Sequence, residues 1–363
     1  MALRVLIAAG GTGGHIFPGL AVAREFQRRD PAVEIRFVGT ARGLESRIVP
    51  AEGFKLELIP VGALKGVSVF ERMRSLAGLP VSFVGALGVI RRFHPQLVIG
   101  IGGYSSGPTL LTAAMKRIPT MVIEPNAMPG FTNRVLGRFV DAAGVSFEES
   151  LRYFKGRGAV TGNPVRGEFA RLQKKERTGK LNLLIFGGSQ GAHSINVAMT
   201  GALPLIPAGK ESLDITHQTG ERDFEEVKRA YAELGFLNAD VRPFIKDMAH
   251  HFEQADVVVS RSGATTVAEI AAAGKAAIFV PFPFATDDHQ RKNAEAFQRN
   301  GAGRMILQAD LTPERLASEI SELIAHPEEI IGMEEASKKL GRPNAAESAV
   351  DLAMKLVTNR FIV

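Results

Sequence analysis

The chain has 363 residues, more than the roughly 250 to 300 at which a single hydrophobic core stops growing, so we expect two domains. An apolar fraction of 45% and a charged fraction of 23% are typical of a globular protein and exclude a disordered or fibrous chain. The absence of cysteine excludes a disulfide framework, a thiolate metal site and a cysteine nucleophile. A formal net charge of +6 favours anionic partners such as nucleotides, lipid phosphates or nucleic acid.

The first half of the chain alternates short apolar runs with helix-like stretches, as βαβ units around a parallel sheet do. No cleavable secretory signal precedes the first run, so we expect no export. A long helix-like stretch covers 70–93, and Pro80 should break or kink it. The predicted strands are 5–9, 35–38, 56–59, 97–101, 121–123 and 142–145.

A basic stretch over 171–180 lacks apolar periodicity and indicates an interdomain linker. A second alternating series follows, and near the end 342–358 reads as an amphipathic helix led by Pro343. The pattern predicts an α/β protein with two doubly wound, Rossmann-like domains, 1–163 and 164–341, and a terminal helix in 342–363 that could pack back on the first domain. The predicted strands of the second domain are 181–186, 213–218, 256–260 and 276–280.

Three glycine-dense loops each follow a predicted strand and precede a helix-like stretch: 10–15, 102–108 and 187–192. Such loops let backbone amides approach an anionic ligand closely, although a plain turn remains the alternative for each. The first loop matches neither the dinucleotide fingerprint nor a P-loop, and Ser106 in the second is a possible helix cap. Because each domain begins with a strand, a diglycine loop and a helix, the pattern favours two ligands over one extended dinucleotide.

The stretch 260–270 also runs from a strand into a helix, whose free amides and dipole would hold a diphosphate. Glu269 could accept hydrogen bonds from ribose hydroxyls, or it could form a capping box with Thr266. The polar run 287–290 could bind sugar hydroxyls, or it could cap a helix. Adjacent aspartates without a spaced partner do not indicate a metal site, and we expect none.

His15 lies in the first glycine loop, and its imidazole has a suitable pKa for a general base at neutral pH. A lone loop histidine is more often a simple hydrogen-bonding residue. Glu124 and Asn126 follow another strand, where they could orient a sugar or the base, unless the segment is only a proline-rich turn.

Taken in order, these segments resemble the MurG family of N-acetylglucosaminyltransferases. The resemblance implies a GT-B fold in which two domains face a central cleft, with the acceptor on the N-terminal domain and UDP-N-acetylglucosamine on the C-terminal domain. It also implies inverting transfer to the muramyl 4-hydroxyl of undecaprenyl-pyrophosphoryl-muramyl-pentapeptide, with no cofactor and no nucleic acid. The matching segments are 10–15, 102–107, 124–126 with Thr132 and Asn133, 162–166, 187–192 and 261–269.

The resemblance further implies roles for individual residues, with His15 as the preferred base and Glu124 as the second candidate. Many relatives differ where this chain has Ile123, Pro125 and His289, which leaves the roles of those neighbours open. The catalytic set is His15, Glu124 and Asn126. The acceptor set is Gly11, Gly103, Tyr104, Ser105 and Ser106. The donor set is Thr12, Gly13, Gly14, Asn126, Arg166, Gly188, Ser189, Gln190, Ile245, Met248, Ser262, Gly263, Ala264, Thr265, Glu269 and Gln290.

The region 65–92 predicts peripheral attachment to an anionic membrane surface, which the lipid acceptor would place on the cytoplasmic face of the bacterial cell membrane. Its apolar run 79–90 is shorter than the about 20 residues that a crossing helix needs. A core helix with solvated charged ends is the alternative. The flanking basic residues are Lys65, Arg72, Arg74, Arg91 and Arg92.

Two other functions remain open at this level. A UDP-N-acetylglucosamine 2-epimerase would share the fold and the donor, but the first-domain loops and Tyr104 argue against it. A non-catalytic nucleotide-binding subunit at the membrane would not require His15 or Glu124.

Overall fold

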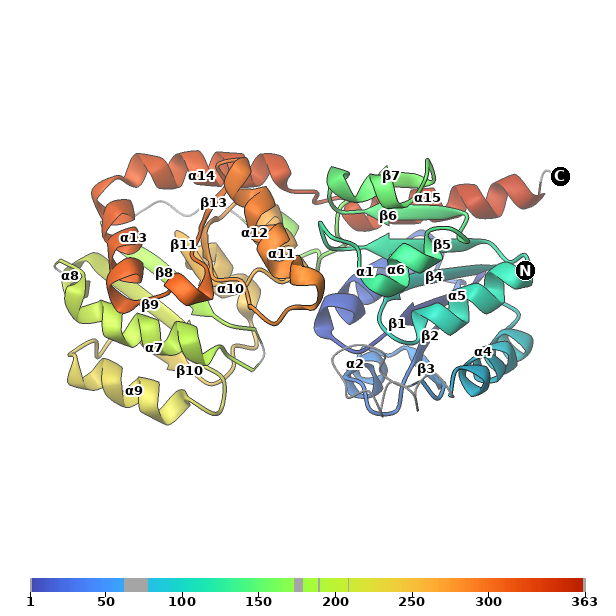
Figure 1. Ribbon diagram of the computed structural model, residues 1–363, viewed down its shortest axis with the longest axis horizontal. Helices are drawn as coiled ribbons and strands as arrows, with labels where there is room; N and C mark the ends of the chain where they lie inside the picture. Colours follow the sequence, from blue (N-terminus) through green and yellow to red (C-terminus); the bar gives the residue numbers. More distant parts are fainter. Residues whose placement is uncertain (1, 62–77, 173–178, 189, 208, 362–363) are drawn as a thin grey trace. The chain divides into compact units, whose positions relative to one another are not determined.

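A computed structural model describes residues 2–61, 78–172, 179–188, 190–207 and 209–361 (Figure 1). The chain forms two compact units, one made of 1–166 together with 342–363 and the other of 167–341. The chain thus passes into the second unit after Arg166, ahead of the basic stretch expected as the linker, of which 173–178 lie outside the described residues.

The first unit is built on a seven-stranded parallel sheet in the order β3-β2-β1-β4-β5-β6-β7. Its strands are β1 (Arg4–Ala9), β2 (Glu34–Gly39), β3 (Lys55–Leu58), β4 (Leu97–Gly102), β5 (Thr120–Glu124), β6 (Ala142–Val145) and β7 (Gly158–Val160). Its helices are α1 (Gly13–Arg29), α2 (Glu45–Ala51), α4 (Leu79–Phe93), α5 (Ser106–Met115), α6 (Phe131–Leu136), η1 (Glu148–Tyr153) and α15 (Ala345–Phe361).

Both faces of this sheet are covered, because alternate strand residues belong to two separate apolar clusters. Ile7 and Ile99 pack with residues of α1 and α15 on one face. Leu6 and Val98 pack with residues of α4, α5 and α6 on the other face. Burial on both sides explains why these strands read as continuous apolar runs in the sequence.

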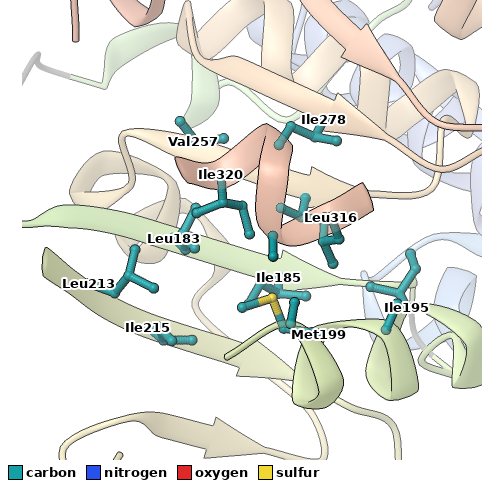
Figure 2. Packing of buried hydrophobic residues seen from close by; sticks show 14 of the residues in the cluster. Leu183, Ile185, Ile195, Met199, Leu213, Ile215, Val257, Ile278, Leu316 and Ile320 are labelled. Atoms are coloured by element: carbon teal, nitrogen blue, oxygen red, sulfur yellow. The ribbon is translucent and has the colours of Figure 1, made fainter. Parts of the chain in front are cut away.

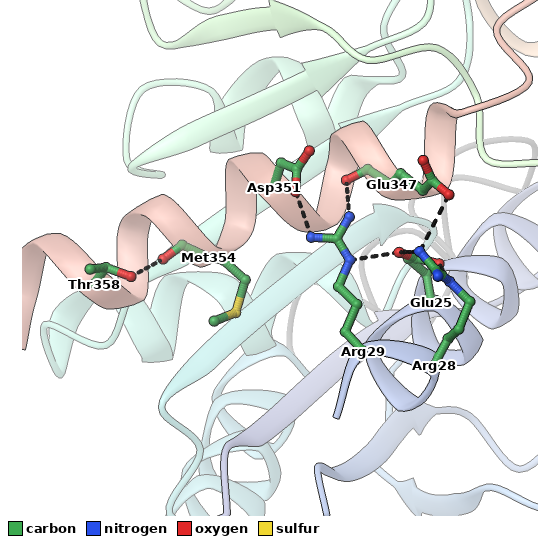
Figure 3. A network of polar contacts seen from close by, with 7 residues as sticks. All are labelled: Glu25, Arg28, Arg29, Glu347, Asp351, Met354 and Thr358. Carbon is green, nitrogen blue, oxygen red and sulfur yellow. Dashed lines mark hydrogen bonds and ion pairs between the residues drawn. The ribbon is translucent and has the colours of Figure 1, made fainter. Parts of the chain in front are cut away.

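Helix α15 returns from the end of the chain to pack along α1 (Figure 3). Buried Glu25 of α1 accepts hydrogen bonds from Arg28 and Arg29 at 2.7 and 2.6 Å. The same two arginines reach across to Glu347 and Asp351 of α15. Ion pairs at the rim therefore supplement the apolar contacts beneath the helix. α15 begins two residues after Pro343, near the start predicted for the terminal helix.

The second unit has a six-stranded parallel sheet in the order β10-β9-β8-β11-β12-β13. Its strands are β8 (Leu181–Phe186), β9 (Leu213–Gln218), β10 (Asp240–Arg242), β11 (Val257–Ser260), β12 (Ala276–Phe279) and β13 (Gly303–Met305). Its helices are η2 (Phe169–Arg171), α7 (His193–Ala202), η3 (Leu203–Leu205), α8 (Gly209–Ser212), α9 (Phe224–Glu233), α10 (Met248–Gln254), α11 (Ala264–Ala273), η4 (Thr286–Asp288), α12 (His289–Arg299), η5 (Gln308–Asp310), α13 (Pro313–Ala325) and α14 (Pro327–Leu340).

Figure 2 shows the core of this unit, where α7 and α13 cover one face of the sheet. Ile195 of α7 and Ile320 of α13 pack over Leu183 and Ile185 of the central strand β8. Each of these side chains is at least 98% buried, so each contributes about 1.5 to 3 kcal/mol of burial free energy.

The architecture confirms the predicted α/β class with two doubly wound sheets, and each of the ten predicted strands is present. Three strands were not predicted: β7, β10 and β13. Each is three residues long and lies at a sheet edge, where a strand pairs with a single neighbour and buries few side chains. Such a strand leaves little apolar pattern in the sequence. Pro80 lies in the first turn of α4, where proline is tolerated, and the part of the predicted stretch over 70–77 lies outside the described residues.

Candidate active site

The glycine loops lie at the topological switch point of each sheet. In the first unit, β1 and β4 are neighbours whose connections run in opposite directions, and they end at Ala9 and Gly102. In the second unit, β8 and β11 have the same relation and end at Phe186 and Ser260. Ligands of open α/β sheets bind beyond the carboxyl ends of strands at such points. The four stretches selected from the sequence therefore flank the two expected binding crevices.

The first loop places His15 within the opening turn of α1. Its Nδ1 lies 3.2 Å from the carbonyl oxygen of Gly10 and 3.3 Å from the Thr12 hydroxyl. A carbonyl only accepts hydrogen bonds, so the contact with Gly10 assigns the proton to Nδ1 and makes Nε2 the basic nitrogen of the neutral ring. Thr12 is the N-cap residue of α1, and Gly13 and Gly14 are the first two residues of the helix.

The second loop packs directly against the first. A Cβ on Gly103 would lie 2.3 Å from the Gly10 carbonyl oxygen, and one on Gly102 would lie 2.9 Å from the His15 ring. Both glycines have positive φ, so these positions need glycine for conformation as well as for space. The structure therefore places His15 and the 102–107 loop in direct contact, on the same side of the candidate site.

The side chains of the second loop divide into buried and exposed groups. Ser106 donates to the carbonyl oxygens of Ala8 and Gly102, and Ser105 to that of Val38, so both buried hydroxyls tie strands together. Tyr104 is 40% exposed. The suggested cap at Ser106 is wrong, because α5 has Ser105 at its N-cap and neither hydroxyl makes a side-chain cap. Only Tyr104 thus presents a side chain outward here.

Glu124 is fully buried at the end of β5 and organises the loop that follows it. One carboxylate oxygen accepts from the backbone and side-chain amides of Asn126, at 2.9 and 3.1 Å. The other accepts from the Gly130 amide at 3.1 Å and from Asn133 at 2.9 Å. Burial raises the pKa of Glu124 to about 7, against the opposing effect of these four donors. The carboxylate thus holds Asn126 and the proline-rich turn in place.

Arg166 is the last residue of the first unit, and its guanidinium lies 5.7 Å from the centre of the Phe17 ring on α1. This contact is of the cation–π kind and restricts a long, flexible side chain.

In the second unit, the 187–192 loop packs tightly on the end of β9. Gly188 and Gly191 have positive φ, and a Cβ on Gly191 would lie 1.8 Å from the carbonyl oxygen of Thr219. Gln190 is exposed, whereas Ser189 lies outside the described residues. The loop precedes α7, whose first residue is His193.

Helix α11 begins at Ala264, directly after the β11 loop, and Gly263 is its N-cap residue. The Thr265 hydroxyl is buried and makes no hydrogen bond within the described residues. Ser262 donates its hydroxyl to the Gln290 carbonyl at 2.8 Å. Glu269 is 7% exposed and is the sixth residue of α11, so the capping-box alternative with Thr266 is wrong.

Gln290 lies in the first turn of α12 and accepts from the Phe282 amide at 3.0 Å, closing the turn after β12. His289 contacts the Thr286 carbonyl through Nδ1. Asp287 and Asp288 both have positive φ, a conformation that aspartate tolerates better than most residues. This turn is therefore a fixed loop beside the start of α11.

The remaining donor residues are Ile245 and Met248, on the stretch between β10 and α10. Ile245 is buried and donates its amide to Gln218 at 2.8 Å, and Met248 is the first residue of α10. The other end of the Gln218 side chain donates to the Gly188 carbonyl at 2.8 Å. Gln218 thereby joins the Ile245 segment to the third glycine loop.

The sequence reasoning missed two residues that support the candidate site, Glu45 and Gln218, and it gave no role to a third, Arg261, although it included this residue in the 260–270 stretch. Arg261 donates to the carbonyls of Val280 and Pro281, to Ser194 and to Gln308, and burial lowers its pKa to about 10. The available signal was position alone, because Gln218 and Arg261 each end or directly follow a strand. Within the described residues, no group of three or more His, Asp or Glu could hold a metal ion, and no helix is long and apolar enough to cross a membrane.

Two doubly wound units with glycine loops at their switch points define a protein of the GT-B class. Two family models match it: the glycosyltransferase family 28 N-terminal domain over 5–145 and the C-terminal domain over 182–349. The chain is 46% identical, over 96% of its length and 97% of the relative's, to the UDP-N-acetylglucosamine--N-acetylmuramyl-(pentapeptide) pyrophosphoryl-undecaprenol N-acetylglucosamine transferase of Geotalea uraniireducens.

Among solved structures, Acinetobacter baumannii MurG is 31% identical with a TM-score of 0.81, covering 97% of this chain and 99% of that chain. A UDP-GlcNAc 2-epimerase from Neisseria meningitidis shares the fold at a TM-score of 0.68, with 14% identity over 97% of this chain and 100% of that chain. The chain belongs to the MurG family within glycosyltransferase family 28.

Proposed function

We propose that this protein is a hexosyltransferase that moves N-acetylglucosamine from UDP-N-acetylglucosamine to the muramyl 4-hydroxyl of undecaprenyl-pyrophosphoryl-muramyl-pentapeptide, a step of peptidoglycan synthesis. The observation that carries the proposal is the match over 96% of the chain to a relative whose name states this transfer. The glycine loops at both switch points supply a place for each substrate.

The donor diphosphate would bind where α11 begins, between Ser262 and Thr265. Free backbone amides and the helix dipole favour an anion there, and the unpartnered Thr265 hydroxyl can donate to a phosphate oxygen. Glu269 would hold the ribose, while the Ile245 segment with Met248 would hold the uracil. The 188–190 loop and Gln290 would contact the diphosphate and the sugar hydroxyls.

The acceptor would bind at the first-unit loops. Gly11 is exposed, and a Cβ there would meet nothing within 4 Å, so a pyrophosphate can approach it closely, while the exposed Tyr104 can contact the muramyl group. Gly103 packs against the Gly10 carbonyl and would support this site from beneath. The buried hydroxyls of Ser105 and Ser106 serve strand-to-loop hydrogen bonds, so they would support this site through the backbone. Thr12, Gly13 and Gly14 at the start of α1 would face the donor sugar.

In the reaction, the acceptor oxygen attacks the anomeric carbon while the bond from that carbon to the UDP oxygen breaks, which inverts the configuration. His15 would take the hydroxyl proton on Nε2, because its Nδ1 proton is held by the Gly10 carbonyl. The electron pair leaves on UDP, whose added charge Arg166 and the α11 amides would stabilise. Glu124 already accepts four hydrogen bonds, so we assign it the role of holding Asn126 rather than that of base.

We further propose peripheral binding to anionic lipid on the cytoplasmic face of the membrane. On α4, Val81 and Val84 are 57% and 69% exposed, and Arg91 and Arg92 follow at the end of the same helix. Exposed Met115 of α5 and Phe131 of α6 lie on helices that cover the same face of the sheet. The expected contributions of Lys65, Arg72 and Arg74 lie outside the described residues.

The membrane proposal is tested by vesicle sedimentation. Binding to anionic vesicles should weaken with salt and in the Arg91→Glu, Arg92→Glu double variant, because each basic residue near the surface adds about 1 kcal/mol. Turnover on a short soluble acceptor should remain unchanged. Equal binding to neutral and anionic vesicles would remove the electrostatic part, and no binding to either would remove the whole proposal.

The transfer itself is tested with purified protein and UDP-N-acetylglucosamine, with and without the lipid-linked muramyl acceptor. We expect UDP release only with acceptor, together with a new β-linked disaccharide. Release of a 2-epimerised sugar without acceptor would favour an epimerase. Donor binding without turnover under either condition would favour a non-catalytic subunit.

A further inference from the structure

Glu45 is a buried carboxylate that the proposed chemistry leaves unexplained. It is the first residue of α2, with no solvent exposure. One oxygen accepts from the backbone amide and hydroxyl of Thr40, at 2.8 and 2.9 Å. The other accepts from the backbone amide of Gly11 at 2.9 Å. The side chain thus connects the loop after β2 with the glycine loop after β1.

The amide that Glu45 holds belongs to the same peptide group that orients His15. In the peptide between Gly10 and Gly11, the N–H and the C=O point in opposite directions because the group is planar and trans. Its N–H donates to Glu45, and its carbonyl lies 3.2 Å from Nδ1 of His15. A single rigid group therefore links the carboxylate to the proposed base, although Glu45 is 30 residues away in sequence.

This peptide needs an anchor because glycine stands on both sides of it. Turning it over requires rotation about ψ of Gly10 and φ of Gly11, and no Cβ hinders either rotation. Gly11 has a φ of +92°, a value that glycine adopts without cost. The local chain therefore allows both orientations, and a partner outside the loop must select one.

The surroundings of Glu45 are shaped to hold its carboxylate. A Cβ on Gly10 would lie 2.7 Å from Oε1, and one on Gly43 would lie 2.0 Å from Oε2. A Cβ on Gly39 would lie 2.4 Å from Cγ. Three glycines thus leave the space that this side chain fills.

We propose that Glu45 is a positioning residue for His15. By holding the Gly11 amide, it turns the Gly10 carbonyl toward Nδ1, which keeps the proton on Nδ1 and the basic lone pair on Nε2. Only the consequence for turnover rests on the proposed function, because the tautomer of His15 is a property of the protein alone.

The test is Glu45→Gln, read by 15N NMR of protein labelled at histidine. The carboxamide keeps one acceptor oxygen, which the two Thr40 donors would engage, and its NH2 group would then face the Gly11 amide. Two facing donors repel, so the peptide turns over, presents N–H to Nδ1 and moves the imidazole proton to Nε2. We expect the Nδ1–H tautomer in the wild type and the Nε2–H tautomer in the variant. Turnover should fall about 10- to 100-fold with an unchanged donor KM.

His15 is identified by the signal that disappears in His15→Asn. The matched control is Glu25→Gln, which also removes a buried carboxylate from this unit. Among the described residues, Glu25 accepts side-chain hydrogen bonds only from Arg28 and Arg29, away from the glycine loop. This control should lower stability and leave the His15 tautomer unchanged.

The outcomes separate this inference from the proposed function. An unchanged tautomer in Glu45→Gln overturns the inference at any level of activity. A wild type with the proton on Nε2 also overturns it, even if the variant does not fold. A changed tautomer with normal turnover supports the positioning by Glu45 and removes His15 as the base.

Discussion

In the 187–192 loop, two glycines allow the cost of backbone conformation to be separated from the cost of a steric collision by one matched pair of substitutions. Gly188 and Gly191 both have positive φ, at +94° and +72°. A Cβ on Gly188 would meet nothing within 4 Å, whereas one on Gly191 would lie 1.8 Å from the Thr219 carbonyl oxygen. Gly188→Ala therefore tests conformation alone, and Gly191→Ala adds a collision with the backbone at the end of β9.

The two variants should therefore lose different amounts of unfolding free energy. A non-glycine residue in the left-handed region costs about 1–2 kcal/mol, and both variants incur this cost. Overpacking adds about 1–3 kcal/mol, and only Gly191→Ala incurs it, because a backbone carbonyl cannot rotate aside as a side chain can. We expect Gly188→Ala to lose about 1–2 kcal/mol and Gly191→Ala about 2–5 kcal/mol.

Calorimetry suits the measurement because the chain contains no tryptophan. Both substitutions lie in the second unit, so comparing the two variants cancels the contribution of the first unit. UDP titration of each variant should show the larger loss of affinity for Gly191→Ala, since the 188–191 turn must shift to relieve the collision. Equal losses of stability and affinity in the two variants would refute the close approach at Thr219.

Three further predictions concern single carboxylates and the base. Glu269→Ala should weaken UDP binding by about 1.5–3 kcal/mol, since a hydrogen-bonded charge is lost; unchanged affinity with a lower thermal midpoint would assign Glu269 to the fold alone. His15→Ala should lower turnover about 100-fold or more with donor binding nearly intact, and normal turnover across the pH range would exclude it as base. The folded pKa of Glu124, about 7 against an ordinary 4.5, means that its contribution to stability is complete below pH 4.5 and is lost as pH rises through 7. The difference in unfolding free energy between wild type and Glu124→Gln should therefore change by about 3 kcal/mol over that interval, and a flat difference would contradict the buried, titrating carboxylate.

The fold was largely predictable because its central strands are buried on both faces. The run Leu97–Gly102 is apolar throughout and Leu181–Phe186 is apolar except for Asn182, and each precedes a glycine loop that marks the strand end. Edge strands carry no such signal, as β10 shows: its three residues include Asp240 and Arg242, and none is fully buried.

The positions of the site loops were predictable for the same reason, since a loop directly after a buried strand is recognised by its place in the pattern. The supports beneath these loops were not. Glu45 contacts Gly11 across 34 residues, and Gln218 contacts Gly188 across 30. Such pairings arise from tertiary packing, and no local periodicity encodes which carboxylate or amide will lie beneath which loop. The sequence alone also could not decide whether Ser106 and Glu269 act as helix caps. The first residue of a helix is set by backbone geometry, and a sequence pattern locates it only to within one or two residues.

The return of α15 to the first unit determines when that unit can be completed during synthesis. Ala349, Val350, Ala353 and Val357 of this helix are buried in the same cluster as Val5 and Ile7 of β1, so the part of this sheet face that α1 does not cover remains exposed until α15 leaves the ribosome. The second unit is contiguous in sequence, from 167 to 341, and has all of its core available earlier. Although domains commonly fold from the N-terminus during translation, here the unit that is made first is finished last. A nascent chain stalled before residue 342 would therefore carry a folded second unit and a first unit in which part of one apolar sheet face is still exposed.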